Sequence, residues 1–216
     1  MTHIKAFTFN TVQENTYLLY DETGEAAIID CGCMNAQEQQ ILSSYCKEKK
    51  LRPTLLLNTH LHFDHAWGNA WALSHWPDIK LYCHPRELTE QPLSSEQARL
   101  FGLSVRYEDV PAEKYQPIFQ GDTLNFGNTS LEVREVPGHS PGHVVFYCKE
   151  AAAVIAGDTL FYEDIGRTDL WGGNYQQLID CIRAQMFTLP AETLVYTGHG
   201  DGTSIGHEIA YNPYFK

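Results

Sequence analysis

The chain has 216 residues, of which 43% are apolar and 19% are charged, and its formal net charge at pH 7 is −12. These values predict one globular domain, residues 1–216, with enough apolar sequence for a large core. The acidic balance disfavours nucleic acid as a partner, because phosphate backbones are bound by clustered lysine and arginine. No stretch approaches a membrane span, and the N-terminal residues lack the charged-then-apolar pattern of a signal peptide, so we expect a cytoplasmic protein without a membrane partner.

The six cysteines help to indicate whether the protein works in a reducing or an oxidising compartment of the cell. Without an export signal, reduced buried thiols are favoured over disulfides. Cys31-Gly32-Cys33 could bind a metal or carry out redox chemistry, but one C-x-C pair without a second is weak evidence for either.

The first part of the chain predicts three strands and then a helix. The strands are expected at residues 4–10, 17–20 and 26–30. A turn at residues 21–24 joins the last two. Asp30 ends the third strand, where its carboxylate could support a metal ligand or accept hydrogen bonds from turn N–H groups. The helix is expected over residues 37–50, with apolar groups at helical spacing and lysines at its end.

Residues 55–65, Leu-Leu-Leu-Asn-Thr-His-Leu-His-Phe-Asp-His, are the most informative stretch. The apolar start predicts a buried strand, and a turn and a helix over residues 66–73 follow. Lone histidines are common on surface loops, but four metal-competent side chains within six positions are difficult to explain in that way. Imidazole with carboxylate suits zinc, iron or manganese. The four are His60, His62, Asp64 and His65.

The remaining elements are mostly strands. A polar region at residues 86–120 is expected to be a surface connection, or else to cover the site or contact a partner. Within it, residues 94–97 resemble a capping box that opens a helix through Phe101. A second helix is expected over residues 175–186, with Asn174 as its N-cap. Strands are predicted at residues 79–83, 122–126, 130–136, 144–148, 152–156 and 193–197.

Three of the later strands lead to a glycine and then to a candidate ligand. The ligands are His139, Asp158 and His199, and glycine beside each one lets the backbone turn sharply. Any one of these three could instead be structural. Counted together, the candidates suffice for two ions. A natural partition gives His60, His62 and His139 to one ion, gives Asp64, His65 and His199 to the other, and makes Asp158 the bridge.

Four motifs in this order resemble the metallo-β-lactamase superfamily. They are Thr-His-Leu-His-Phe-Asp-His at 59–65, Pro-Gly-His-Ser-Pro-Gly-His at 137–143, Gly-Asp-Thr-Leu-Phe at 157–161 and Gly-His-Gly at 198–200. The resemblance covers nearly the whole chain. It implies an α/β fold, a four-layer αβ/βα sandwich of two mixed sheets with helices outside and metals at one edge. It places the family's metal ligands on the seven residues above and makes His143 a supporting or structural residue.

Within the superfamily, residues 165–170 (Ile-Gly-Arg-Thr-Asp-Leu) and the final residues 199–214 are similar to the short bacterial type of glyoxalase II. The implied activity is metal-dependent hydrolysis of a small thioester such as an S-2-hydroxyacylglutathione. The implied cofactors are two divalent ions, zinc first, with iron or manganese as alternatives. They would acidify the attacking water and polarise the carbonyl, and catalytic Asp64 would orient the water.

The substrate residues are less well defined. Arg167 could hold a substrate carboxylate or tie down its own loop. Tyr162, Asn174 and Tyr175 are candidates for lining the pocket. Longer glyoxalase II enzymes bind glutathione partly through a C-terminal extension that this sequence does not contain, which leaves the thiol carrier and the acyl group open. The oligomeric state is also open.

Other functions of the same fold are alternatives. Persulfide dioxygenases resemble this motif set but use one Fe(II), whose ligands here would be His60, His139 and Asp158. A β-lactamase is disfavoured by the missing export signal and a nuclease by the acidic charge. A scaffold protein without catalysis should show broken ligands, and none is broken.

Overall fold

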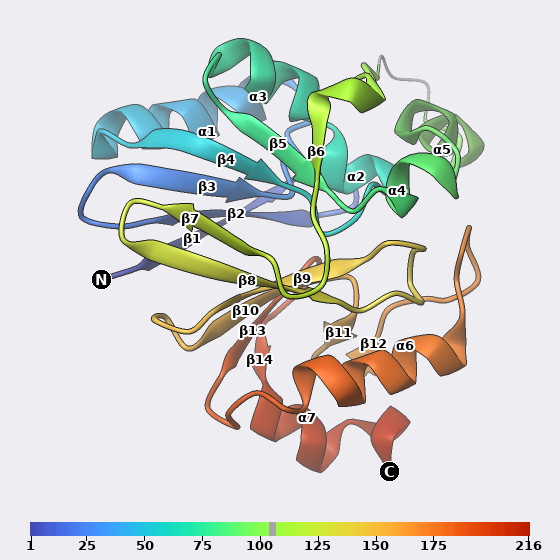
Figure 1. Ribbon diagram of the computed structural model, residues 1–216. Helices are drawn as coiled ribbons and strands as arrows, with labels where there is room; N and C mark the ends of the chain where they lie inside the picture. Colours follow the sequence, from blue (N-terminus) through green and yellow to red (C-terminus); the bar gives the residue numbers. More distant parts are fainter. Residues whose placement is uncertain (104–106) are drawn as a thin grey trace.

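The computed structural model describes residues 1–103 and 107–216. Two six-stranded mixed sheets lie face to face, and helices cover the outer side of each (Figure 1). The predicted α/β fold class, a four-layer sandwich of two mixed sheets with helices outside, is therefore confirmed. A small third sheet pairs β11 (Leu160–Phe161) with β12 (Asp164–Ile165).

The first sheet has the strand order β1-β2-β3-β4-β5-β6. The first three strands are antiparallel, and β3 to β6 are parallel, so these parallel strands end at one edge. Loops beyond the carboxyl ends of parallel strands are where α/β folds place their sites. The bounds are β1 His3–Phe9, β2 Glu14–Tyr20, β3 Glu25–Ile29, β4 Arg52–Leu57, β5 Lys80–Cys83 and β6 Tyr115–Pro117.

The second sheet has the order β14-β13-β10-β9-β8-β7. Only β10 and β13 are parallel in it, and the other pairs are antiparallel. Strands β8, β10 and β13 are the ones that lead to His139, Asp158 and His199. The bounds are β7 Thr123–Phe126, β8 Thr129–Glu135, β9 Val144–Cys148, β10 Ala153–Gly157, β13 Leu194–Thr197 and β14 Thr203–Ser204.

Helices α1 and α3 cover the outer face of the first sheet, α2, α4 and α5 lie beyond the carboxyl ends of its strands, and α6 and α7 lie on the second sheet (Figure 1). As predicted, Asn174 caps α6, its Oδ1 accepting from the N–H of Gln177 at 3.0 Å. The helix bounds are α1 Ala36–Lys49, α2 Phe63–Ala66, α3 Asn69–His75, α4 Arg86–Thr89, α5 Ser94–Leu100, α6 Tyr175–Cys181 and α7 Ile205–Tyr211. Shorter turns are the 3₁₀ helices η1 Ala112–Lys114 and η3 Pro213–Phe215, and the π-helix η2 Ile182–Met186.

Three apolar cores hold these layers together. The largest side chains between the sheets include Leu57, Phe126 and Phe146, all at most 1% exposed. A second core joins the second sheet to α6, and a third joins the first sheet to α1 and α3. Each such side chain contributes about 1.5–3 kcal/mol on burial, so the cores fix the sheets as a rigid base for the loops at their edge.

The helix predicted over residues 66–73 is interrupted at Gly68. The N–H of Gly68 donates to the carbonyl of Cys31 at 2.7 Å, and a Cβ on Gly68 would lie 2.7 Å from Cys31 Sγ. Close packing against the loop after β3 therefore splits the segment into α2 and α3. Cys31 and Cys33 are both fully buried, and all six cysteines are free thiols.

The predicted capping box at residues 94–97 is wrong. Leu93 precedes α5 without a side-chain cap, and the side chains of Ser94 and Gln97 both donate to the carbonyl of Leu61, at 3.1 and 3.2 Å. Their polar groups are used to hold a neighbouring loop. Among the described residues, no helix is long and apolar enough to cross a membrane.

Candidate metal centre

The turn after β4 is shaped by hydrogen bonds from two asparagines. Asn58 Nδ2 donates to the carbonyl of His65 at 3.1 Å, and Asn69 Nδ2 donates to Asn58 Oδ1 at 2.8 Å. These bonds fold the chain directly into α2. His62 therefore stands just before that helix, and Asp64 lies inside it beside His65.

His60, His62 and His139 form the first ligand group. One ligand atom of each lies within 4.8 Å of the other two, and all three side chains are buried. His62 Nδ1 and His139 Nε2 are 2.9 Å apart, although the two residues come from opposite halves of the sandwich. Three imidazoles at this spacing suit zinc or another borderline metal ion.

Asp64, His65 and His199 form the second ligand group, with the same 4.8 Å limit between their ligand atoms. Asp64 Oδ2 lies 3.1 Å from His199 Nε2 and 3.6 Å from His65 Nε2. His199 is the most open of the ligands, at 28% side-chain exposure. This group therefore faces the solvent side of the site more than the first group does.

Asp158 lies between the two groups. Its Oδ1 is 3.4 Å from His65 Nε2, and its Oδ2 is 3.6 Å from both His139 Nε2 and His199 Nε2. The structure therefore brings all seven candidate ligands together, and it separates them as the partition predicted from the sequence does.

The electrostatics of the two groups differ. Burial lowers the pKa of His62 to about 3 and also lowers the pKa values of His60 and His139, which keeps these imidazoles neutral and able to bind a cation. Burial opposes protonation of His65 and His199 too, but the carboxylates of Asp158 and Asp64 outweigh it and raise both pKa values. The carboxylates thus attract positive charge to the second group, which a divalent ion would supply.

The donor atoms that these groups leave without partners fit a metal. Three buried ligand atoms that face the site have no hydrogen-bond partner among the described residues: His60 Nε2, His65 Nε2 and Asp158 Oδ1. Buried polar atoms are normally paired, because leaving one unpaired costs about 1–3 kcal/mol. Their convergence on one place, with the chemistry of the donor set, points to bound divalent ions.

Hydrogen bonds behind the ligands fix which ring nitrogen faces the site. Asp30 Oδ2 lies 3.0 Å from His65 Nδ1 and also accepts from the Thr59 hydroxyl at 2.6 Å. Because Thr59 gives its proton to Asp30, its oxygen accepts from His60 Nδ1 at 3.0 Å. The carbonyl of Arg167 accepts from His139 Nδ1 at 2.8 Å. Such outer partners orient metal-binding imidazoles, so Asp30 takes the supporting place that the sequence allowed.

His143 also lies behind the ligands. Its Nε2 accepts from the N–H of Asp158 at 3.2 Å, and its ring stacks on that of His60 with centroids 4.7 Å apart. Glycines allow the close approach of these segments: a Cβ on Gly157, where φ is +51°, would lie 2.4 Å from Thr59 Oγ1, and one on Gly198 would lie 2.0 Å from Asp158 Oδ1.

A cavity of about 270 Å³ opens above the ligands. Its floor is polar, and Val12, Phe63, Phe101 and Leu170 form apolar walls. Val12 and Phe101 are 43% and 46% exposed, so part of each side chain is free to contact a bound molecule. Sequence reasoning missed these wall residues, because they come from four separate segments that only the fold brings together.

The predicted substrate residues lie in different places. Arg167 lines the cavity, but its guanidinium makes two hydrogen bonds to Asp169, at 2.7 and 2.8 Å. Tyr162 stacks on His207 with centroids 4.9 Å apart, away from the residues that line the cavity. The side chain of Asn174 is used as the cap of α6, and Tyr175 is a half-exposed residue in the first turn of that helix.

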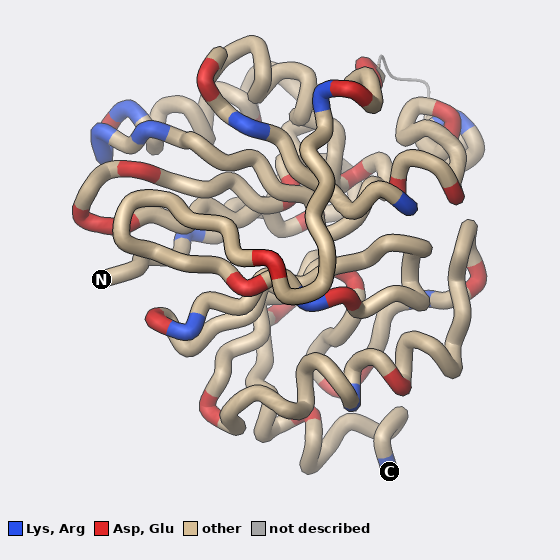
Figure 2. The backbone as a smooth tube through the Cα atoms, viewed as in Figure 1, with Lys and Arg blue, Asp and Glu red and all other residues tan. Residues whose placement is uncertain are grey.

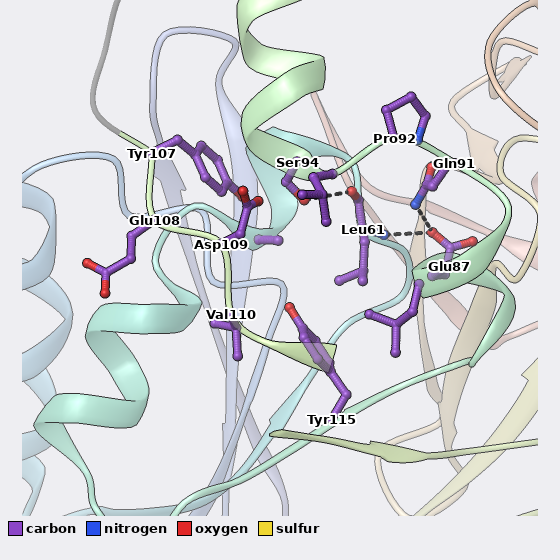
Figure 3. Close-up of a pocket in the computed structure, with 13 residues that line it drawn as sticks. Leu61, Glu87, Gln91, Pro92, Ser94, Tyr107, Glu108, Asp109, Val110 and Tyr115 are labelled. Carbon is purple, nitrogen blue, oxygen red and sulfur yellow. Dashed lines mark hydrogen bonds between the residues drawn. The ribbon is translucent and has the colours of Figure 1, made fainter. Parts of the chain in front are cut away.

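The described residues of the polar region 86–120 pack against the outer side of the turn after β4, which carries His60 and His62. Figure 3 shows Leu61 between Glu87 and Ser94, with a small cavity beside it that Tyr107 and Tyr115 help to line. The Tyr107 hydroxyl donates to the carbonyl of Phe63 at 3.0 Å. The described part of this region therefore packs against the segment that carries the first ligands, and residues 104–106 lie outside the described residues.

Comparison with known proteins agrees with this geometry. Residues 10–199 match the model of the metallo-beta-lactamase superfamily. The chain is 39% identical over 206 residues to the probable metallo-hydrolase YqgX of Bacillus subtilis, covering 95% of this chain and 93% of that protein. It is 32% identical over 215 residues to the hydroxyacylglutathione hydrolase GloC of Haemophilus influenzae, covering 99% and 98% of the two chains.

Two solved structures are similar over nearly their whole length. The BLEG-1 B3 metallo-beta-lactamase has a TM-score of 0.86 and 32% identity, covering 99% of this chain and all of that one. TTHA1623 in a di-iron-bound form has a TM-score of 0.85 and 36% identity, covering 97% and 99%. With its ligand groups, its fold and these relatives taken together, the chain belongs to the metallo-β-lactamase superfamily and is one of its metallo-hydrolases.

Proposed function

We propose that the protein hydrolyses a small-molecule thioester of the glyoxalase II type, an S-2-hydroxyacylglutathione or a related acyl thioester. The observation that carries the proposal is the complete second group, Asp64, His65 and His199, beside the first. Three further side chains that can bind a metal converge there, two of them buried, which favours a second ion. The similarity to GloC, named as a hydroxyacylglutathione hydrolase, supports the same reaction.

In this proposal the chain holds two divalent ions, zinc by the donor set, with iron or manganese as alternatives. The ions supply Lewis acidity and a water that is acidic enough to react near neutral pH. His60, His62 and His139 hold one, Asp64, His65 and His199 hold the other, and Asp158 is shared. Asp64 also accepts a hydrogen bond from the attacking water and so orients it. A thiolate leaves without protonation, so the chain needs no dedicated general acid.

The cavity suits such a substrate. Its apolar walls can pack against the hydrocarbon part of an acyl group or of a thiol carrier. Arg167 can exchange Asp169 for a substrate carboxylate, because an exposed ion pair contributes only about 0–1 kcal/mol. Acidic and basic side chains lie interspersed over both halves of the molecule (Figure 2), and with a net charge of −12 this favours a small molecule over nucleic acid. Six free thiols are in keeping with the cytoplasm.

The test is the loss of thioester absorbance with S-lactoylglutathione and with the same acyl group on a non-glutathione thiol. The protein is loaded separately with zinc, manganese or iron. We expect metal-dependent turnover that falls at least about 100-fold in Asp64→Ala, the scale for removing an electrostatic group from an active site. Asp180→Ala, an exposed carboxylate of α6, is the matched control and should keep full turnover.

Each negative outcome has a separate meaning. Turnover only with the second thiol would exclude glutathione as the carrier. No turnover with either thioester would reject thioester hydrolysis. Oxygen uptake with glutathione persulfide, by iron-loaded protein and undiminished in Asp64→Ala, would establish the one-iron dioxygenase, whose ligands His60, His139 and Asp158 are also in place.

A further inference from the structure

Glu87, in α4, has one of the most highly connected side chains in the described structure. It is 2% exposed, and each of its two carboxylate oxygens accepts two hydrogen bonds. Oε2 accepts from the N–H of Leu61 at 2.8 Å and from Gln91 Nε2 at 2.7 Å (Figure 3). Oε1 accepts from the Ser140 hydroxyl at 2.7 Å and from the N–H of Gly142 at 2.6 Å. The carboxylate therefore joins three segments that are distant in the sequence.

The partners of Glu87 stand next to the first ligand group. Leu61 lies between His60 and His62, and Ser140 directly follows His139. The first two histidines follow β4 of one sheet and the third follows β8 of the other. Glu87 thus joins the two halves of the sandwich at the place where the three histidines converge.

The Leu61 peptide is held from both sides. While its N–H donates to Glu87, its carbonyl accepts from Ser94 Oγ and Gln97 Nε2. Hydrogen bonds from backbone N–H groups to a carboxylate are roughly twice as strong as neutral ones, and in a buried place they have no water to compete with. The segment that carries the first two histidines is therefore fixed by groups that lie outside the ligand set.

We propose that Glu87 is a positioning residue for the first metal ion, setting the separation between the His60–His62 segment and His139. It is not among the residues that line the substrate cavity, so it acts through the ligands and not on the substrate. The inference rests on the metal-binding part of the proposed function and not on the identity of the substrate.

The test is the zinc affinity of the first group in Glu87→Gln. The carboxamide keeps the size of the side chain but presents an NH₂ group where donors already point. The chain with Glu87 and the chain with Glu87→Gln are both made with Asp64→Ala, which removes a ligand of the second group. The measured zinc affinity is then that of the first group. Competition with a chromophoric chelator measures the affinity, and the visible spectrum of the cobalt form reports the geometry. We expect affinity to fall at least about tenfold, with a changed cobalt spectrum, as for other outer partners of metal ligands.

Glu208→Gln is the matched control. Glu208, in α7, is also fully buried and accepts hydrogen bonds from Thr203 Oγ1, the Glu163 N–H and Asn212 Nδ2, but none of these adjoins a ligand. Its substitution should lower the melting temperature and leave the zinc affinity and the cobalt spectrum unchanged. Gln91→Ala should also keep the zinc affinity, because it removes a donor to Glu87 and leaves both ligand segments attached.

The outcomes distinguish a failure of the positioning role of Glu87 from a failure of the proposed metal site. If Glu87→Gln binds zinc as tightly as its parent while it melts earlier, the positioning role is wrong and Glu87 is only structural. If the parent itself takes up no zinc, the proposed metal role of the three histidines fails instead. Should Glu87→Gln not fold, Glu87→Asp replaces it, because the shorter side chain keeps the charge but cannot reach the donors of both ligand segments at once. Weaker zinc binding there supports the proposal, and unchanged binding overturns it.

Discussion

Both ends of the sandwich are joined by a buried carboxylate, but the two ends differ in what surrounds it. Asp21 lies before β3, at the end opposite the ligands, and accepts hydrogen bonds from Thr23 of its own half and from Asn128 and Thr129 of the other half. Glu87 joins the halves at the ligand end. Beside Asp21 the polar groups are paired, whereas at the ligand end three buried ligand atoms that face the site have no partner among the described residues.

The difference shows how one scaffold separates stability from function. At the Asp21 end, each hydrogen bond adds to the stability of the sandwich. At the ligand end, the fold holds unpaired imidazoles and carboxylates close together, a cost that bound ions offset. Substitutions at the Asp21 end should therefore act mainly on stability, and substitutions at the ligand end mainly on metal binding. The following predictions run from the largest expected effect to the smallest.

Removing metal should destabilise the protein most. Ions that bind only the folded chain stabilise it by about 4 kcal/mol when their concentration is 1,000 times the Kd. We expect a chelator to lower the melting temperature and added zinc to restore it, as measured by differential scanning calorimetry. Asp21→Asn should show the same zinc-dependent rise, because it lies at the other end. Equal melting temperatures with and without zinc would contradict a site built from these ligands.

Asp30→Asn should weaken binding of the second ion more than binding of the first, because Asp30 contacts His65 directly and reaches His60 only through Thr59. Asparagine tolerates the positive φ of +53° at this position, but it removes the negative charge beside His65 Nδ1. Loss of such an outer carboxylate weakens metal binding by about 10–100-fold. Zinc titration against a chelator should show one strongly weakened site and one that is weakened less. Equal weakening of both would mean that the two groups do not bind independently.

Asp21, at the end of the sandwich opposite the ligands, should make the free energy of unfolding depend on pH in the acid range. Burial alone would raise the pKa of Asp21, but hydrogen bonds from Thr23, Asn128 and Thr129 outweigh it and lower the pKa to about 2. Since this pKa lies below the unfolded value near 4, the stabilisation is complete above about pH 4 and is lost as the pH falls through 2. It amounts to about 2 kcal/mol. Urea unfolding of wild type and Asp21→Asn should differ at pH 6 and converge towards pH 2; a constant difference would contradict this origin.

Phe101→Ala should have the smallest effect, confined to substrate binding. Removing half-buried aromatic surface from the cavity wall costs about 1 kcal/mol, which corresponds to a KM about fivefold higher for a thioester with an apolar group. Metal content should not change. Leu100→Ala is the control, because Leu100 is more exposed and is not among the residues that line the cavity. A fall in kcat alone would place Phe101 in another role.

The ligands could be predicted from the sequence because their signal is local. Short spacing after an apolar run marked His60, His62, Asp64 and His65, and a glycine before each later ligand marked the ends of three strands. The two-sheet fold followed from those motifs through the family resemblance. The ligand grouping required only that strand ends meet at one edge, as β4, β10 and β13 do.

The residues that support the site could not be predicted, because their roles depend on tertiary contacts. Glu87 is an ordinary glutamate in a polar segment until folding brings Leu61 and Ser140 to it. Ser94 and Gln97 fit a capping pattern, but the carbonyl of Leu61 takes their hydrogen bonds. The short strand β6 has little periodicity of its own and forms by pairing with β5.

The contact between Asn15 and β13 has a consequence for the order of folding. Asn15 Nδ2 donates to the carbonyl of Thr197 across 182 residues of sequence, and the N–H of Asn15 donates to the carbonyl of Gly198, directly before His199. The start of β2 is thus closed by one of the last strands to leave the ribosome. Contacts between such distant residues slow folding, so we expect the second ligand group, which contains His199, to be completed late in folding.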